Sequence, residues 1–152
     1  MRRYTRSASF TSLWNLCMTI PAPTGTIWGM RERGLREWDQ VPPGSQPAMF
    51  LHQGPQRATR RRQEGVTTWE WYAMLAVYFR LDTLRNGSDF EIINELLDSI
   101  EAVFIGRIPG EQQTLGGTIY DCYIDGEIGV YEGDSDPNQG VVLCPLVLLT
   151  GV

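Results

Sequence analysis

The sequence predicts a small α/β (α+β) domain, in which a mixed or antiparallel sheet of about four to five strands is flanked by helices. Residues 66–81 alternate in hydrophobicity with the period of a strand and form the strongest strand pattern in the chain. Residues 88–105 carry apolar side chains at the i, i+3, i+4, i+7 spacing of an amphipathic helix. Residues 141–149 are almost wholly apolar, as in a buried strand. The chain of 152 residues is expected to form a single domain around one core.

The region before the long strand is expected to hold one short helix, two short strands and two loops. Apolar side chains recur at helical spacing in the helix, and Pro21, Pro23 and Gly25 end it. The second loop is rich in arginine and is either mobile or the tip of a hairpin. No pattern specifies a role for residues 1–30, the helix and the Pro/Gly-rich segment after it. The expected bounds are residues 8–18 for the helix, 26–35 and 48–52 for the strands, and 38–47 and 53–65 for the loops.

The long strand and the long helix supply most of the expected core. Ser88 and Glu91 form an S-x-x-E capping box at the helix start, and Gly106 and Pro109 end the helix. The opposite face of the strand is mixed in character, so it is either half covered or an interface. The buried face of the strand is expected to carry Trp69, Trp71, Ala73, Leu75, Val77 and Phe79.

The C-terminal part is expected to add two strands joined by a turn at residues 132–140. Residues 118–131 alternate as one strand. Pro145 removes a backbone donor from the last strand, which predicts that this strand lies at a sheet edge or carries a bulge. The buried face of the strand at 118–131 is expected to hold Cys122, Ile124, Ile128 and Val130.

The charge of the chain is divided unevenly along the sequence. All cations are arginines, and the net charge is −5. Residues 1–63 hold ten arginines and three acids (10 − 3 = +7), whereas residues 64–152 hold three arginines and fifteen acids (3 − 15 = −12). Either the two segments form separate surfaces through which copies associate, or they mix in space and their charges average out.

No residue pattern predicts catalysis, a cofactor or a metal site. His52 is the only histidine, and no nucleophile motif accompanies it. Asp134, Asp136 and Asn138 have the spacing that opens a calcium loop, but Gln139 replaces the required glycine. The three cysteines, Cys17, Cys122 and Cys144, lack CxxC spacing and are expected to be free thiols in a reducing compartment. The longest apolar run has nine residues, too few to span a membrane.

Two groups of charged side chains are candidate interaction sites. Arg57, Arg60, Arg61 and Arg62 form a basic cluster that can dock on a neighbouring subunit or, alternatively, on nucleic acid phosphates. No alternating aromatics surround it, as single-strand binding would require. Glu91, Glu95 and Asp98 share one face of the long helix, where an acidic stripe is either solvated or faces a partner.

Several segments resemble phage tail-terminator (tail-completion) proteins of long-tailed bacteriophages. The resemblance covers about residues 35–149 and is carried by the order and spacing of its segments rather than by one motif. Residues 1–30 have no counterpart in it. The segments are Trp38 with residues 46–51 (QPAMFL), residues 96–102 (LLDSIEA), residues 113–128 (QTLGGTIYDCYIDGEI), residues 131–134 (YEGD) and the last strand at 141–149.

The resemblance implies a structural virion protein rather than an enzyme. Such proteins form a hexameric ring on the last ring of the tail tube, end tube growth and join the tail to the head connector, while DNA passes through the pore. They are assembled in the bacterial cytoplasm. With this function, the basic cluster and the acidic stripe are candidate subunit or ring contacts. The candidate pore-lining residues are either Glu132, Asp134 and Asp136 or the acids on the outward face of the strand at 118–131, Asp121, Asp125 and Glu127. The alternatives are another neck or tail-tube subunit, and a nucleic-acid-binding module that uses residues 57–62.

Overall fold

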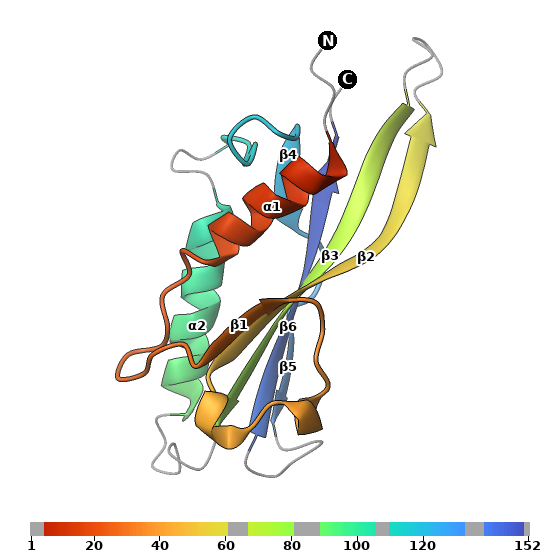
Figure 1. Cartoon of the computed structure of the whole chain (residues 1–152). Coiled ribbons are helices and arrows are strands. Elements are labelled where there is room, and N and C mark those ends of the chain that lie inside the picture. The colour runs from red at the N-terminus through yellow and green to blue at the C-terminus, as the bar shows by residue number, and fades with distance from the viewer. Residues whose placement is uncertain (1–4, 61–66, 81–88, 106–109, 133–138, 151–152) are drawn as a thin grey trace.

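The computed structural model describes residues 5–60, 67–80, 89–105, 110–132 and 139–150 (Figure 1). It has an α+β fold with two α-helices, two short 3-10 helices and six strands. The helices are α1 (Arg6–Cys17), η1 (Trp38–Gln40), η2 (Pro43–Ser45) and α2 (Asp89–Phe104). The strands are β1 (Met30–Arg33), β2 (Ala48–Arg60), β3 (Thr67–Arg80), β4 (Asp121–Ile124), β5 (Gly129–Glu132) and β6 (Gln139–Leu149).

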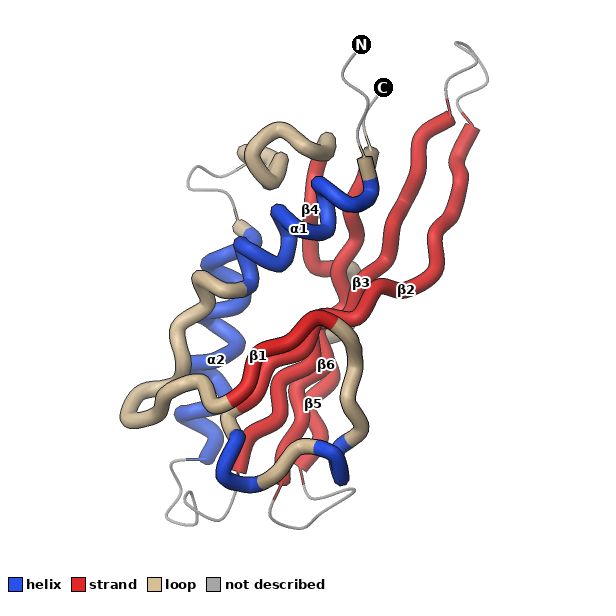
Figure 2. Tube along the Cα trace, viewed as in Figure 1, coloured by secondary structure: helices blue, strands red, loops and turns tan. Residues whose placement is uncertain are grey.

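The strands form one mixed sheet in the order β1-β2-β3-β6-β4, with β5 also paired to β6 (Figure 2). Only the β1–β2 pair is parallel; all other pairs are antiparallel. The predicted mixed sheet flanked by helices is confirmed. The sheet has six strands rather than about four to five, because the expected strand at 118–131 is two strands.

Both helices cover the same face of the sheet, and the main core lies between them and the sheet (Figure 1). The predicted helix at 8–18 is confirmed as α1, and its expected apolar residues Phe10, Leu13 and Cys17 are buried. The predicted faces of β3 are also confirmed, since Trp71, Leu75, Val77 and Phe79 are buried against the helices. α2 and β6 complete this core with Ile93, Leu96, Ile100, Phe104, Val142, Cys144, Leu146 and Leu148.

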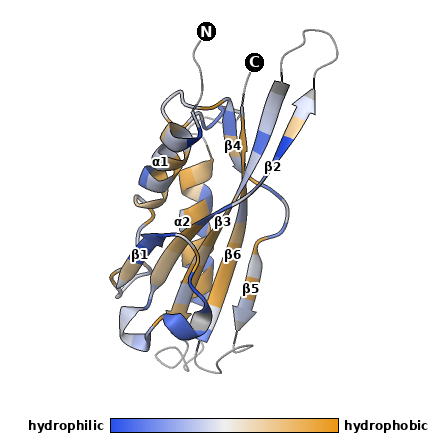
Figure 3. Ribbon diagram, turned by 45° about the vertical axis from the view of Figure 1, so that its right-hand side comes forward, coloured by the Kyte–Doolittle hydropathy of each residue, from blue (hydrophilic) through white to orange (hydrophobic). Residues whose placement is uncertain are grey.

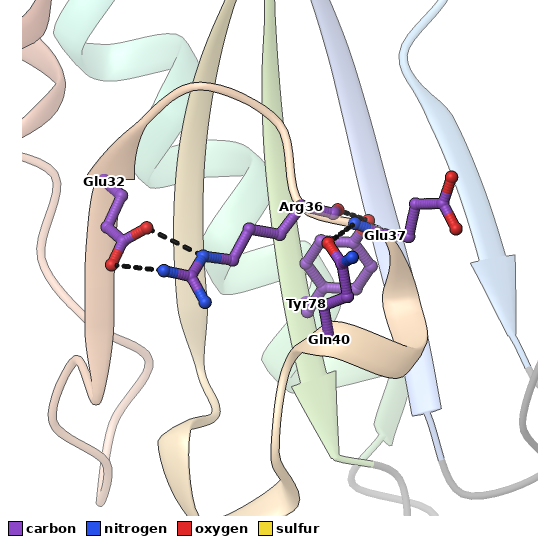
Figure 4. A network of polar contacts seen from close by, with 5 residues as sticks. All are labelled: Glu32, Arg36, Glu37, Gln40 and Tyr78. Carbon is purple, nitrogen blue, oxygen red and sulfur yellow. Dashed lines mark hydrogen bonds and ion pairs between the residues drawn. The ribbon is translucent and has the colours of Figure 1, made fainter.

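The opposite face of the sheet is covered at one end only. There the segment between β1 and β2 folds back and buries Phe50 and Tyr78 with three smaller residues, Val41, Ala48 and Ala76. The hydroxyl of Tyr78 donates to the backbone carbonyl of Arg36 at 2.7 Å, and the Arg36 guanidinium forms a two-point ion pair with Glu32 of β1 (Figure 4). These contacts hold the covering segment in place. The mixed face of β3 is therefore half covered, which was one of the two alternatives predicted for it.

The arginine-rich segment is a strand and not a loop up to Arg60. β2 continues for 13 residues, pairs with β3 as far as Arg60↔Thr67, and carries an irregularity between Gln53 and Gln56. The prediction of a loop or hairpin tip from residue 53 is therefore wrong for residues 53–60, which form one strand of a β2–β3 hairpin, and residues 61–65 of the predicted segment lie outside the described residues. Low hydrophobicity hid this strand, because an exposed edge strand needs no apolar face.

The strand predicted at 118–131 is interrupted in the middle. Gly126, with a φ of 83°, breaks it into β4 and β5, which pair with opposite ends of β6. Val130 is 38% exposed, so its predicted burial is wrong.

Pro145 lies in the interior of the sheet, with β3 on one side of its strand and β4 and β5 on the other, which contradicts the predicted edge position. The β3–β6 register is regular across Pro145, so the predicted alternative of a bulge is not observed against β3 either. The carbonyl of Pro145 accepts a hydrogen bond from the N–H of Asp125, so the nitrogen of Pro145 points to the same side of β6. On that side, Pro145 has no paired residue in β4 or β5. The missing donor is tolerated because the neighbouring strand is broken at that level.

Some predicted features lie outside the described residues. They are the cap residue Ser88, the helix-ending Gly106 and Pro109, and most of the turn predicted at 132–140.

Candidate assembly surfaces

The far half of the β2–β3 hairpin forms an arm that extends past the end of β1 (Figure 1). We define this arm as residues 52–60 and 67–73. β1 covers the outer edge of β2 only at Ala48–Leu51, and the last bond on this side runs from the N–H of Gly34 to the carbonyl of Leu51 at 2.7 Å. From His52 onward, no strand in the described part of the chain pairs with this edge of β2. The arm therefore presents unpaired backbone donors and acceptors, which another strand can satisfy.

The arm carries positive charge on the sheet face turned away from the helices. Arg57 is exposed and lies directly opposite Glu70 of β3. Glu70 also accepts a 2.7 Å hydrogen bond from the hydroxyl of Tyr72. This bond, with smaller contributions from desolvation and from the charge of Glu70, raises the pKa of Tyr72, while Arg57 lowers it. Glu70 therefore lies beside both Arg57 and Tyr72, and Arg57 is the exposed member of the pair on the outer strand.

The base of the arm is fixed to the N-terminal helix by Arg6. Its guanidinium carbon lies 5.0 Å from the ring centroid of Trp69 and 5.1 Å from that of Trp71. Its Nε donates to the side chain of Gln56 at 2.6 Å. Phe10 stacks on the same Trp71 with a centroid separation of 6.0 Å. The arm is therefore braced at its base by α1.

The opposite edge of the sheet, formed by β4, β5 and their connection, is acidic. We call residues 121–132 the acidic edge. Asp125 and Glu127 are exposed, and Asp121 is half-buried. Tyr123, 37% exposed, lies between Asp121 and Asp125. Partial burial and then the nearby Asp125, Glu70 and Asp121 charges raise its pKa. Among the described residues, no strand pairs with the outer side of β4 or β5.

The arm and the acidic edge lie at the same level on opposite sides of the sheet. Arg57 pairs with Glu70, Glu70 pairs with Leu149, and Leu149 pairs with Asp121. This row crosses the sheet from its basic to its acidic side. At this level, one edge of the sheet carries the exposed Arg57 and the other carries Asp121 and, next along the chain, the exposed Asp125 (Figure 3 shows the hydrophilic residues on the arm).

The residues predicted as interaction sites do not all meet. Arg57 and Arg60 lie on β2, and Arg61 and Arg62 are outside the described residues. The members of the acidic stripe, Glu91, Glu95 and Asp98, share one face of α2, away from the arm (Figure 1).

Glu95 has an intramolecular role that the sequence did not reveal. Its carboxylate accepts hydrogen bonds from the backbone N–H of Thr24 at 3.0 Å and from the Thr24 hydroxyl at 2.6 Å. It ties the Pro/Gly-rich segment to α2. Glu91 and Asp98 are exposed beside it.

Of the three predicted pore-lining residues, Glu132 is the last residue of β5, and Asp134 and Asp136 lie outside the described residues. The alternative pore-lining group consists of the outward acids of the strand predicted at 118–131. Of these, Asp121 lies on β4, and Asp125 and Glu127 lie on the connection to β5. These acids lie at a sheet edge because β4 pairs with the end of β6, and the sequence alone does not show this pairing.

The remaining candidate groups are placed as follows. His52 is exposed on β2, opposite Met74. The three cysteines are buried and free, as predicted. Burial raises the thiol pKa of Cys17 and of Cys144 to about 12, and raises that of Cys122 still further. Within the described ranges, no three His, Cys, Asp or Glu side chains are grouped so that they can hold a metal ion. No described helix is long and apolar enough to cross a membrane.

No protein-family model matches the sequence, and no curated protein does. Among solved structures, the chain is similar to one from a structure described as "Virion of native gene transfer agent (GTA) particle". The two share 10% sequence identity with a TM-score of 0.44, over 95% of this chain and 93% of that chain.

Proposed function

We propose that this chain is a structural virion protein of a long-tailed phage, which forms a ring that caps the tail tube. The sequence resemblance to tail-terminator proteins supports this proposal. In such a ring, one face meets the last ring of the tube, the other meets the head connector, and DNA passes through the pore. The proposed ring is hexameric.

One observation carries the proposal on the structural side: the sheet has two different edges of opposite charge. A closed ring needs a heterologous interface, in which one patch of each subunit meets a different patch of the next. The arm with Arg57 and the acidic edge with Asp121, Asp125 and Glu127 are such a pair. A symmetric dimer would instead require one self-complementary patch.

The first test is assembly of the purified chain. We expect native mass measurement and negative-stain images to show rings with an open pore at high protein concentration. If the free chain is monomeric, the deciding assay is addition to purified tail tubes. Tubes that no longer elongate and that carry one added layer support the terminator function, whereas open-ended stacking indicates a tube subunit and unaltered elongation contradicts the proposal.

The pore-lining role of Glu132, Asp134 and Asp136 belongs to the same proposal. Acidic side chains along a pore repel DNA phosphates and let the duplex slide. A ring carrying Asp134→Asn and Asp136→Asn should retain DNA more strongly at low salt than the unchanged ring. Equal retention by both rings would remove these residues from the pore.

The alternative, a nucleic-acid-binding module, is favoured only by the exposed arginine on the arm. Binding of single-stranded or duplex DNA with steep salt dependence, in a chain that does not cap tubes, would establish it instead. The net charge of −5 works against such a role.

A further inference from the structure

We infer that the arm of one copy takes β4 of a second copy as an additional strand, with Arg57 of the first beside Asp125 of the second. This inference rests on the proposed function, because it names the contact by which copies join. Its first support is the unpaired outer edge of β2 beyond Leu51. An exposed strand edge is a template for another strand, and natural chains leave it open at the risk of aggregation.

The occupant follows from strand direction and charge. β2 is antiparallel to β3, β3 to β6, and β6 to β4, so β4 runs opposite to β2. A second copy related by rotation about an axis tilted from the strands, as in a closed barrel, therefore presents β4 antiparallel to β2. The pairing continues the antiparallel sheet from copy to copy. It also brings the acidic edge to the basic arm, which steers association and fixes the register.

The register is limited by β1. Without a shift, β5 of the second copy would be level with Ala48–Phe50, the part of the β2 edge that β1 occupies, so the second copy must be shifted along the strands toward the arm tip. A shift of about four residues, the length of β1, clears it. Closing a sheet on itself requires such a stagger between neighbours. Without a shift, Arg57 is level with Asp121; with this shift, it is level with Asp125, which is exposed and lies on the same sheet face.

The irregularity in β2 is consistent with this register. The ladder with β3 is disturbed between Gln53 and Gln56, where Pro55 lacks a donor. Beyond it, residues Gln56 to Arg60 pair regularly with β3 and so present a regular outer edge. The added strand is expected on this regular part of the arm.

The first experiment is thiol cross-linking of the full chain. Thr59→Cys and Tyr123→Cys place thiols on the same sheet face, on the arm and on β4. In one chain, two strands and an offset of four residues along β3 separate these positions, because Thr59 pairs with Thr68 whereas Tyr123 is level with Tyr72. The Cα distance is roughly 19 Å from strand spacing and rise, too far for a disulfide. The native cysteines are buried and stay unreactive. Mild oxidation should give a ladder of covalent multimers for this pair, and monomers for the control pair Thr59→Cys with Asn94→Cys on α2.

The second experiment reverses charges. Arg57→Glu and Asp125→Arg, each alone, should weaken self-association about tenfold or more, and the double variant should recover most of it. Glu101→Arg, an exposed charge reversal on α2, should have no effect. Thermal unfolding of each variant separates loss of assembly from loss of folding.

The outcomes also distinguish this inference from the proposed function. Rings that form without the Thr59–Tyr123 cross-link and without recovery in the double variant overturn the inference and leave the ring in place. A chain that stays monomeric both in solution and on tube ends also overturns the inference. In that case, the tube-capping assay alone tests the proposed function. Open filaments with a positive cross-link sustain the inference and contradict a terminator.

Discussion

Gly140 lies directly against the ring of Phe79, its partner across the β3–β6 pair. A Cβ built on Gly140 would lie 2.4 Å from both Cε2 and Cζ of Phe79. Phe79 is buried in the main core, and the glycine therefore provides the space that this ring fills.

Gly140→Ala should lower stability by about 1–3 kcal/mol, because the ring of Phe79 must shift within a packed core. Denaturant unfolding measures the change. Gly44→Ala is the matched control: no atom lies within 4 Å of its Cβ position, so it should be neutral or slightly stabilising. Equal denaturation midpoints for the two variants would show that the Phe79 ring can move to accommodate the added methyl group without loss of stability.

Arg6→Lys should separate the shape of the guanidinium from its charge. Lysine keeps the positive charge but loses the planar group that lies over Trp69 and Trp71 and the bond from Nε to Gln56. We expect a loss of about 0.5–1 kcal/mol and a change in tryptophan fluorescence. Arg33→Lys, on β1, should leave the fluorescence unchanged. A fluorescence spectrum that Arg6→Lys does not alter would show that the contact is dispensable.

Glu95→Ala should destabilise the chain by about 1 kcal/mol, because it removes the acceptor of both Thr24 bonds. Glu91→Ala and Asp98→Ala, exposed neighbours on the same helix, should stay within about 0.5 kcal/mol of the parent. Thr24→Val in the Glu95→Ala background should then add little, since the hydroxyl bond that it breaks is already lost when Glu95 is replaced. Additive losses would contradict this coupling. Thermal or denaturant unfolding of the four variants measures the effect.

Stability should fall as the pH rises from 9 toward 12. The folded-state pKa of Cys17 and of Cys144 is raised to about 12 from 9.0, so the folded chain retains protons that the unfolded chain releases. The stabilisation is fully present below pH 9 and is lost as the pH approaches the folded-state value. At pH 10, each of these two buried thiols should lower the free energy of unfolding by about 1 kcal/mol.

Lysine titration does not obscure this window, because the chain has no lysine. Urea unfolding at pH 8 and at pH 10 measures the change, and Cys17→Ala should reduce the pH-dependent part. Thiol reagents should label native protein at pH 8 only as fast as it unfolds. Rapid labelling of all three thiols would disprove their burial.

The core elements could be predicted because burial imposes a period. The alternation in β3 and the i, i+3, i+4 pattern of α2 specify which side chains face the core, and the structure buries Trp71, Leu75, Ile93 and Leu96 accordingly. The arm could not be predicted in this way. Its strand is exposed on one edge and polar, and hydrogen bonding to β3, rather than burial, makes it a strand.

The sequence by itself determined the α+β class, the position of the two main helices, the apolar face of β3, the free cysteines and the separation of charge between its two halves. The tertiary structure alone decided that β6 is an interior strand, that residues 118–131 divide around Gly126, and that Arg57 and Asp121 lie in one row on opposite edges of the sheet. The hydrophobic pattern of a segment shows which of its side chains face the core. The order of strands across the sheet depends on pairing between residues far apart in the chain, and only the folded sheet brings them together.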